Sequence, residues 1–255
     1  MIPAWLSFMD GLLAVALALA GVVGAHYGLT TSLLGFSLVL GGGALGVFGV
    51  LAGLIGLIRT ASPARRAGRP RAVIGIILSL IVVAPPLGVF FTHRYPPIND
   101  ITTDTVNPPE FVKAQEIPAN HGRDMKYDAT KYASAQQGAE VYKDLAPLKL
   151  DAAPDDVFKK AEIIAGEIPS WRITNSDPSK RTLEGVATSA IFHFVDDWVI
   201  EVRAADGGGS LVEMRSKSRD GVGDLGVNYH RIKSFFRLLR GPVRGAVTPG
   251  QAGAQ

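Results

Sequence analysis

The residues with the greatest capacity for chemistry lie near the C-terminus, in the stretch RSKSRDGVGDLGVNYHR between Arg215 and Arg231. Within it, GVGDLG (221–226) satisfies G-x-G-x-x-G, the pattern of turns that bind the pyrophosphate of a dinucleotide. Such a site also needs a second parallel strand and an acidic residue about 20 residues further on. At that distance beyond Gly226 the chain has Ala246, in a Gly- and Pro-rich end without a strand pattern. We therefore expect no nucleotide and no other cofactor here.

Two interpretations of this stretch stay open. Asp224 is placed to cap a helix that begins near Val227, and polar side chains before and after it are spaced to reach one another. The first interpretation is a polar latch that ties the last strand to the last helix. The second is an anion site, in which Arg219 and the N-terminus of the helix face a phosphate or carboxylate. The candidate residues are Arg215, Ser216, Ser218, Arg219, Asp224, Asn228 and Arg231.

Other catalytic signals are weak. The chain has no cysteine, which excludes thiol catalysis, disulfides and cysteine-ligated metals, and it has no HExxH, GxSxG or SxxK motif. His193, Asp196 and Asp197 suggest a metal corner, but adjacent aspartates between two strands favour a hydrated turn. The isolated acids that we interpret as paired surface charges are Glu184, Glu201 and Glu213. We expect no metal site.

Periodicity places these residues in an α+β domain. A helix begins near Pro154, and Gly166 and Pro169 end it. The strand patterns cover 171–177, 182–194, 198–205 and 210–216, and a last helix covers 227–240. The fold class is therefore an antiparallel meander of about four strands with flanking helices. We expect one face of the sheet to be wet and the other to pack on helices.

Three glycines at 207–209 predict the register of a hairpin. If they form its loop, opposite charges face one another on one side of the sheet and apolar residues on the other. The predicted pairs are Asp206–Ser210, Arg203–Glu213, Glu201–Arg215 and Val202–Met214.

The first 92 residues have a different composition. Three apolar runs, within 4–25, 31–58 and 72–92, are long enough for transmembrane helices. The first lacks the basic n-region of a signal peptide and is too long for its apolar core, so we expect it to be retained.

The charges of this half predict its orientation. Its five basic residues all lie in RTASPARRAGRPR (59–71), and its one acid is Asp10. By the positive-inside rule the arginine loop is cytoplasmic, so the N-terminus is cytoplasmic and the chain after Thr92 is outside the cytoplasm. We expect a multi-pass protein of the plasma (inner) membrane with a periplasmic domain in the cell envelope. The remainder is nearly neutral, which argues against nucleic-acid binding.

The second apolar run has a face of small residues. Steps of three and four residues place its glycines on one side of a helix, where they let another helix approach closely. Packing within the chain is one interpretation, and a homodimer or a membrane protein partner is the other. The glycines are Gly42, Gly46, Gly49, Gly53 and Gly56.

These patterns divide the chain into four parts. Residues 1–92 form a membrane domain, 93–118 a Pro-rich strap, 119–240 the soluble α+β domain, and 241–255 a disordered tail.

Three segments resemble the domain of unknown function 1499 family, which occurs in bacterial envelope proteins and plastids, sometimes behind transmembrane helices. They are YPPINDITTD, FHFVDD and MRSKSRDGVGDLGVNYHRI, and the resemblance covers Tyr95 to Leu239. The positions that match the late motif are Arg215, Ser216, Ser218, Arg219, Gly221, Asp224, Gly226, Asn228 and Arg231. The family has no established activity, so the resemblance implies a domain boundary and no catalytic residue.

The sequence thus predicts a membrane-anchored, extracytoplasmic binding or interaction module without catalysis, whose partners are the lipid bilayer and membrane proteins. The alternative is a small envelope enzyme, or a protein that binds an anionic ligand or a lipid headgroup, using the loop from Arg219 to Asp224.

Overall fold

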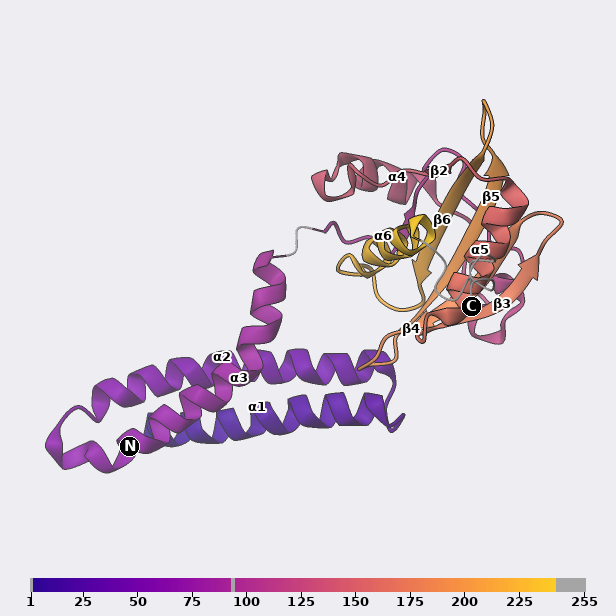
Figure 1. The fold of residues 1–255 in the computed structure, drawn as a ribbon. Helices are drawn as coiled ribbons and strands as arrows, with labels where there is room; N and C mark the ends of the chain where they lie inside the picture. Colours follow the sequence, from indigo (N-terminus) through magenta and orange to yellow (C-terminus); the bar gives the residue numbers. More distant parts are fainter. Residues whose placement is uncertain (1, 93–94, 242–255) are drawn as a thin grey trace, which may run out of the picture. The chain divides into compact units, whose positions relative to one another are not determined.

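A computed structural model describes residues 2–92 and 95–241 (Figure 1). Contacts divide the chain into two compact units, residues 1–94 with 189–194, and residues 95–188 with 195–255. The tail predicted at 241–255 lies outside the described residues from 242 onward.

The first unit contains three long apolar helices, α1 (Ile2–His26), α2 (Ser32–Arg59) and α3 (Arg69–Thr92). All three are long and apolar enough to cross a membrane, which confirms the predicted runs as candidate spans. Thr31 caps α2 by accepting a hydrogen bond from the Leu34 N–H at 3.2 Å, and the arginine loop contains a 3-10 helix, η1 (Pro63–Gly68). The segment Ser189–Phe194 groups with this unit, where the Phe192 ring lies edge-on to Phe36.

The glycine face of α2 packs inside the first unit. All five predicted glycines are buried, and several contact α1 or α3 so closely that no side chain fits. A Cβ on Gly42 would lie 2.8 Å from the Ala14 carbonyl oxygen, and a Cβ on Gly56 would lie 3.0 Å from the Ala4 nitrogen. The small residues therefore serve contacts between helices of one chain.

The second unit is built on a six-stranded antiparallel sheet of order β1-β6-β5-β4-β3, with β2 also paired to β6. The strands are β1 (Asp100–Thr102), β2 (Leu148–Leu150), β3 (Trp171–Asp177), β4 (Thr182–Thr188), β5 (Val195–Ala204) and β6 (Ser210–Ser218). The predicted meander is confirmed as β3 to β6. The predicted strand 182–194 ends earlier, at Thr188, and β1 and β2 are additions.

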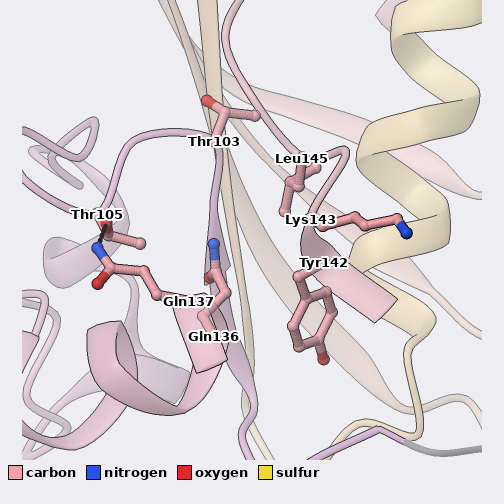
Figure 2. A pocket seen from close by; sticks show the side chains of 7 residues that line it. All are labelled: Thr103, Thr105, Gln136, Gln137, Tyr142, Lys143 and Leu145. Carbon is pink, nitrogen blue, oxygen red and sulfur yellow. Dashed lines mark hydrogen bonds between the residues drawn. The ribbon is translucent and has the colours of Figure 1, made fainter. Parts of the chain in front are cut away.

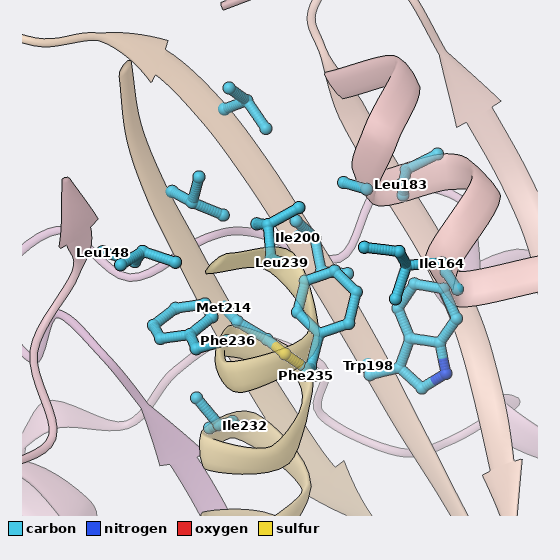
Figure 3. Packing of buried hydrophobic residues seen from close by; sticks show 14 of the residues in the cluster. Leu148, Ile164, Leu183, Trp198, Ile200, Met214, Ile232, Phe235, Phe236 and Leu239 are labelled. Carbon is cyan, nitrogen blue, oxygen red and sulfur yellow. The ribbon is translucent and has the colours of Figure 1, made fainter. Parts of the chain in front are cut away.

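Two helices, α5 (Pro154–Glu167) and α6 (Val227–Arg240), pack on one face of this sheet and enclose the apolar core (Figures 1 and 3). Trp198 on β5 is fully buried, its ring 4.6 Å from that of Trp171, and it lies opposite Gly185 of β4. The fully buried apolar residues beside it include Ile200, Met214, Ile232, Phe235 and Leu239. The helix bounds agree with those expected from periodicity.

The opposite face of the sheet is covered as well, so the expectation of a wet face is wrong. Phe111, Ala114 and Met125 form a second apolar cluster with Val199 of β5. They come from the stretch after β1, which contains the short helices η2 (Ala114–Glu116) and η3 (Pro118–Asn120) and leads to α4 (Ala129–Gly138) and η4 (Glu140–Tyr142). The expected strap thus contributes β1 and η2 to the second unit. The polar residues that alternate along the strands therefore face a charged interior on this side of the sheet and not solvent.

The β5–β6 hairpin differs in register from the prediction by two residues. Ala204, not Asp206, pairs with Ser210, so the loop is longer and includes Ala205 and Asp206 beside the glycines. Glu201 consequently lies opposite Glu213, and Val202 lies opposite Val212. The ion pair between Arg203 and Glu213 still forms, because a long side chain reaches a diagonal neighbour across the strands.

Candidate functional site

The seven candidate residues gather where β6 ends and α6 begins, but the sheet separates them into two groups. Side chains alternate along a strand. Ser216 and Ser218 therefore contact α6, whereas Arg215 and Arg219 point to the face covered by the stretch after β1.

The group beneath α6 is a polar latch. Ser216 Oγ lies 2.7 Å from Asn228 Oδ1, and Asn228 Nδ2 donates to Ser218 Oγ at 3.0 Å. Arg231 donates to Ser216 Oγ at 2.9 Å and forms an ion pair with Asp196 of β5. Asn228 is fully buried, so these bonds satisfy polar groups that would otherwise be buried without partners.

Asp224 completes the latch at the start of α6. Its carboxylate accepts the N–H groups of Gly226 at 2.9 Å and Asn228 at 2.8 Å, as the capping prediction requires, although the N-cap position itself is Gly226. Burial raises the pKa of Asp224, and these two N–H groups oppose that shift. Gly226 has φ +84° and lies so close to the Tyr95 ring that no side chain fits there.

On the opposite face, Asp100 holds two cationic groups. Arg215 donates to both of its oxygens, from Nε at 2.8 Å and Nη2 at 2.7 Å, and Lys217 Nζ donates at 2.8 Å. Asp100 and Arg215 are fully buried. The guanidinium lies 4.8 Å from the Phe111 ring centre and also donates to the Met125 carbonyl at 3.1 Å. Such a pair is stable only because its hydrogen bonds are nearly complete.

Asp197 holds a second pair of cations. Arg219 donates to it from Nη2 at 2.7 Å, Arg123 from Nη1 at 2.9 Å, and Asn120 from Nδ2 at 3.1 Å. Arg123 also donates to the Ser218 carbonyl at 2.8 Å, which joins the stretch after β1 to the end of β6. Asp197 is fully buried, but the side chains of Arg123 and Arg219 are 21% and 15% exposed.

These six groups form what we call the charged layer. Its members are Asp100, Arg123, Asp197, Arg215, Lys217 and Arg219. Four cationic side chains share two carboxylates, so the layer keeps a surplus of positive charge. Each carboxylate accepts hydrogen bonds on both oxygens.

The environments predicted from the sequence for Asp196, Asp197 and Glu184 are wrong. Asp196 and Asp197 lie on β5 and not in a hydrated turn, and as consecutive strand residues they face opposite sides of the sheet. Glu184, expected at the surface, is buried and accepts the backbone N–H groups of Lys113 and Ala114, each at 2.8 Å. In the described residues no group of three or more His, Asp or Glu side chains is arranged to hold a metal ion.

Glu213 was also expected at the surface and is buried. Burial raises its pKa, while the Arg203 guanidinium opposes that shift.

Arg123 and Asn120 are further residues of the site that could not be predicted from the sequence. They lie in an irregular stretch without periodicity, and nothing in their spacing connects them to Asp197.

A cavity of about 240 Å³ lies elsewhere in the second unit (Figure 2). Its lining residues are Thr103, Thr105, Gln136, Gln137, Tyr142, Lys143 and Leu145. The Gln136 amide is already bonded to the backbone of Thr102, and Gln137 donates to Thr105 Oγ at 2.6 Å. The Tyr142 hydroxyl points away from the other labelled side chains (Figure 2). Two of the amide groups that line this cavity thus already have partners within the protein, whereas the buried Tyr142 hydroxyl has none among the described residues.

Comparison with known proteins identifies the domain and no activity. No curated protein matches the chain. A family model described as protein of unknown function (DUF1499) matches residues 100–239, a stretch that begins at β1 and ends in the last turn of α6. The sheet, the latch and the charged layer all lie within that match, and the chain therefore belongs to the DUF1499 family.

Proposed function

We propose that this protein is a membrane-anchored, extracytoplasmic binding module that takes an anionic group between Arg123 and Arg219, without catalysis. The observation that supports it is the charge of the charged layer, where four cations share two carboxylates. Arg123 and Arg219 are its partly exposed guanidinium groups, and guanidinium groups suit phosphate and carboxylate ligands.

The alternative, a small envelope enzyme, needs a side chain able to accept or donate a proton to substrate. At this site the carboxylates of Asp100 and Asp197 are occupied by arginine and lysine. Asp224 is occupied by backbone N–H groups. The same site therefore favours binding over reaction.

The compartment is part of the proposal. The arginine loop between α2 and α3 is the basic loop of the first unit, so the positive-inside rule places it in the cytoplasm and the second unit outside it. We assign the protein to the plasma membrane of the cell envelope on this ground.

The test is a titration of the full chain, in nanodiscs of zwitterionic lipid, with inorganic phosphate and with acetate. We expect the titration to show heat of binding at low ionic strength. The affinity should fall as salt is added, because the site is partly exposed. Arg219→Gln and Arg123→Gln each remove a charge-assisted contact of about 1.5–3 kcal/mol, so affinity falls roughly 10- to 100-fold.

Arg172→Gln is the matched control, since Arg172 is exposed on the edge strand β3 and its substitution changes the net charge by the same amount. If phosphate binds all three variants equally, or fails to bind the folded wild type, the proposed function is wrong.

A further inference from the structure

The loop between β6 and α6 presents apolar side chains to its surroundings. Val222 is 77% exposed, Leu225 is 53% exposed, and Val227, the first residue of α6, is 48% exposed. We call these three residues the apolar tip. Single exposed aliphatic residues are ordinary on protein surfaces, whereas three of them within six residues of one loop form a candidate interaction surface.

The backbone of the loop holds Leu225 outward under strain. Its φ is +52°, in the left-handed region that residues other than glycine rarely adopt. The neighbouring Gly226 N–H is bound by Asp224, which fixes this conformation. A glycine would adopt this φ without strain, but it has no side chain. Leu225 instead exposes an apolar side chain at a strained backbone position.

The loop is bound to the segment that follows the last apolar helix. The Asp224 N–H donates to the Ile98 carbonyl at 3.2 Å, and Asn99 Nδ2 donates to the Gly221 carbonyl at 2.6 Å. The described part of this segment begins at Tyr95, three residues after α3 ends at Thr92. From Thr92 to Ile98, where the loop is bound, six residues of extended chain span at most about 22 Å. The covalent chain therefore sets an upper limit on the distance between this segment and the end of α3, the helix whose residues up to Gly88 belong to the third candidate span.

We propose that the apolar tip inserts into the interfacial region of the lipid bilayer. Lipid is the occupant that the chain itself supplies, because tethering holds the tip at a high effective concentration next to the membrane. The tyrosines beside the loop agree with this placement, since the rings of Tyr95 and Tyr229 lie 6.1 Å apart and tyrosine is enriched at membrane interfaces. The proposal does not depend on the anion site.

The experiment uses the absence of cysteine, which allows single cysteines to be introduced into the full chain without other changes. Val222→Cys and Leu225→Cys carry an environment-sensitive fluorophore (NBD) in nanodiscs that hold one chain each. Val106→Cys is the control, since Val106 is 78% exposed and lies after β1, outside the loop.

We expect a blue-shifted emission for both loop positions and quenching by nitroxide-bearing lipids at least twofold stronger than for Val106→Cys. Water-like emission and equal quenching at all three positions would overturn the proposal. A blue shift that occurs only in particles with several chains would also overturn it, in favour of a second copy as the occupant.

Folding is checked by circular dichroism of each labelled variant, and Val227→Cys replaces any variant that does not fold. Phosphate titration of the same samples separates the two proposals, because loss of membrane insertion leaves the affinity of the Arg123–Arg219 site unchanged.

Discussion

Asp100 illustrates how strongly the second unit depends on single buried charges. This carboxylate accepts hydrogen bonds from Arg215 and Lys217, and both it and Arg215 are fully buried. Neutralising one partner of such a group leaves the other charges without compensation, which is more destabilising than the pair is stabilising.

We therefore predict that Asp100→Asn lowers the free energy of unfolding of the second unit by about 3–5 kcal/mol. Denaturant unfolding of the full chain in detergent measures it, in a Trp5→Phe background so that the fluorescence comes from Trp171 and Trp198. Asp206→Asn, an exposed residue of the β5–β6 loop, is the control and should change stability by less than about 0.5 kcal/mol. Equal effects of the two substitutions would show that the Asp100 ion pairs contribute little.

The buried carboxyl group of Asp224 leads to a prediction about how stability depends on pH. Burial raises its pKa in the folded protein, so folding is favoured while the carboxyl is protonated, and this contribution is lost as pH rises through the folded-state pKa. An asparagine side chain has one acceptor oxygen, so it keeps only one of the two backbone N–H bonds, and it carries no charge at any pH. The lost hydrogen bond lowers stability equally at every pH, but the stability of Asp224→Asn relative to wild type should rise as pH rises from about 4 to 7, as measured by denaturant unfolding at each pH.

Asp128 is a control of opposite sign. It caps α4 from an exposed position, and its hydrogen bonds with the Thr130 hydroxyl and the Lys131 N–H lower its pKa. Asp128→Asn should therefore lose stability relative to wild type as pH rises from about 2 to 5, the range around the ordinary aspartate pKa. Parallel trends for the two variants would contradict the assignment.

At the residue scale the sequence predicted which side chains meet locally and not their distant partners. Ser216, Asn228 and Arg231 are close in sequence, and strand and helix periods place them together. Arg215 was grouped with them, but alternation turns it to the other face, where it meets Asp100 across 115 positions of sequence. No spacing rule predicts a contact of that length.

At the scale of elements, β4 and β5 pack tightly where Gly185 lies opposite Trp198. A Cβ on Gly185 would overlap the Trp198 ring and lie 2.5 Å from the Arg172 carbonyl oxygen. Both neighbours are held in place, the carbonyl by backbone geometry and the ring by Trp171 and the core.

We predict that Gly185→Ala destabilises the second unit by about 1–3 kcal/mol, because an overpacked core must shift its side chains or backbone. Thermal unfolding followed by tryptophan fluorescence measures it. Gly166→Ala is the control, since nothing lies near that glycine and its φ is not in the left-handed region. An unchanged midpoint for Gly185→Ala would contradict the described packing.

The long elements were predictable and the short ones were not. α5, α6 and β3 have clear periodicity and matched the prediction closely. β1 and β2 have three residues each, too few for a pattern, and exist because β6 offers them backbone partners. The predicted hairpin register is wrong because the glycines indicate where the loop lies but not how many flanking residues belong to it.

At the scale of the whole molecule, the helix count and the arginine loop make one topology prediction. A reporter active only outside the cytoplasm should be active when fused after Leu239 and inactive when fused at Ala67, because three spans put these positions on opposite sides. Alkaline phosphatase activity in cells provides the measurement. The reverse pattern would place the second unit in the cytoplasm and remove the basis for an extracytoplasmic function.

The pairing of β1 with β6 has a consequence for biosynthesis. β1 is the first strand of the second unit to leave the ribosome, yet its Asp100 pairs with residues of β6, among them Arg215, 115 positions later. At a synthesis rate of 5–20 residues per second, the interval is roughly 6–23 s. Throughout this interval the three candidate membrane spans have already been synthesised, while the edge strand β1 has no partner. Chaperones and proteases therefore have access to this unpaired strand before the sheet closes.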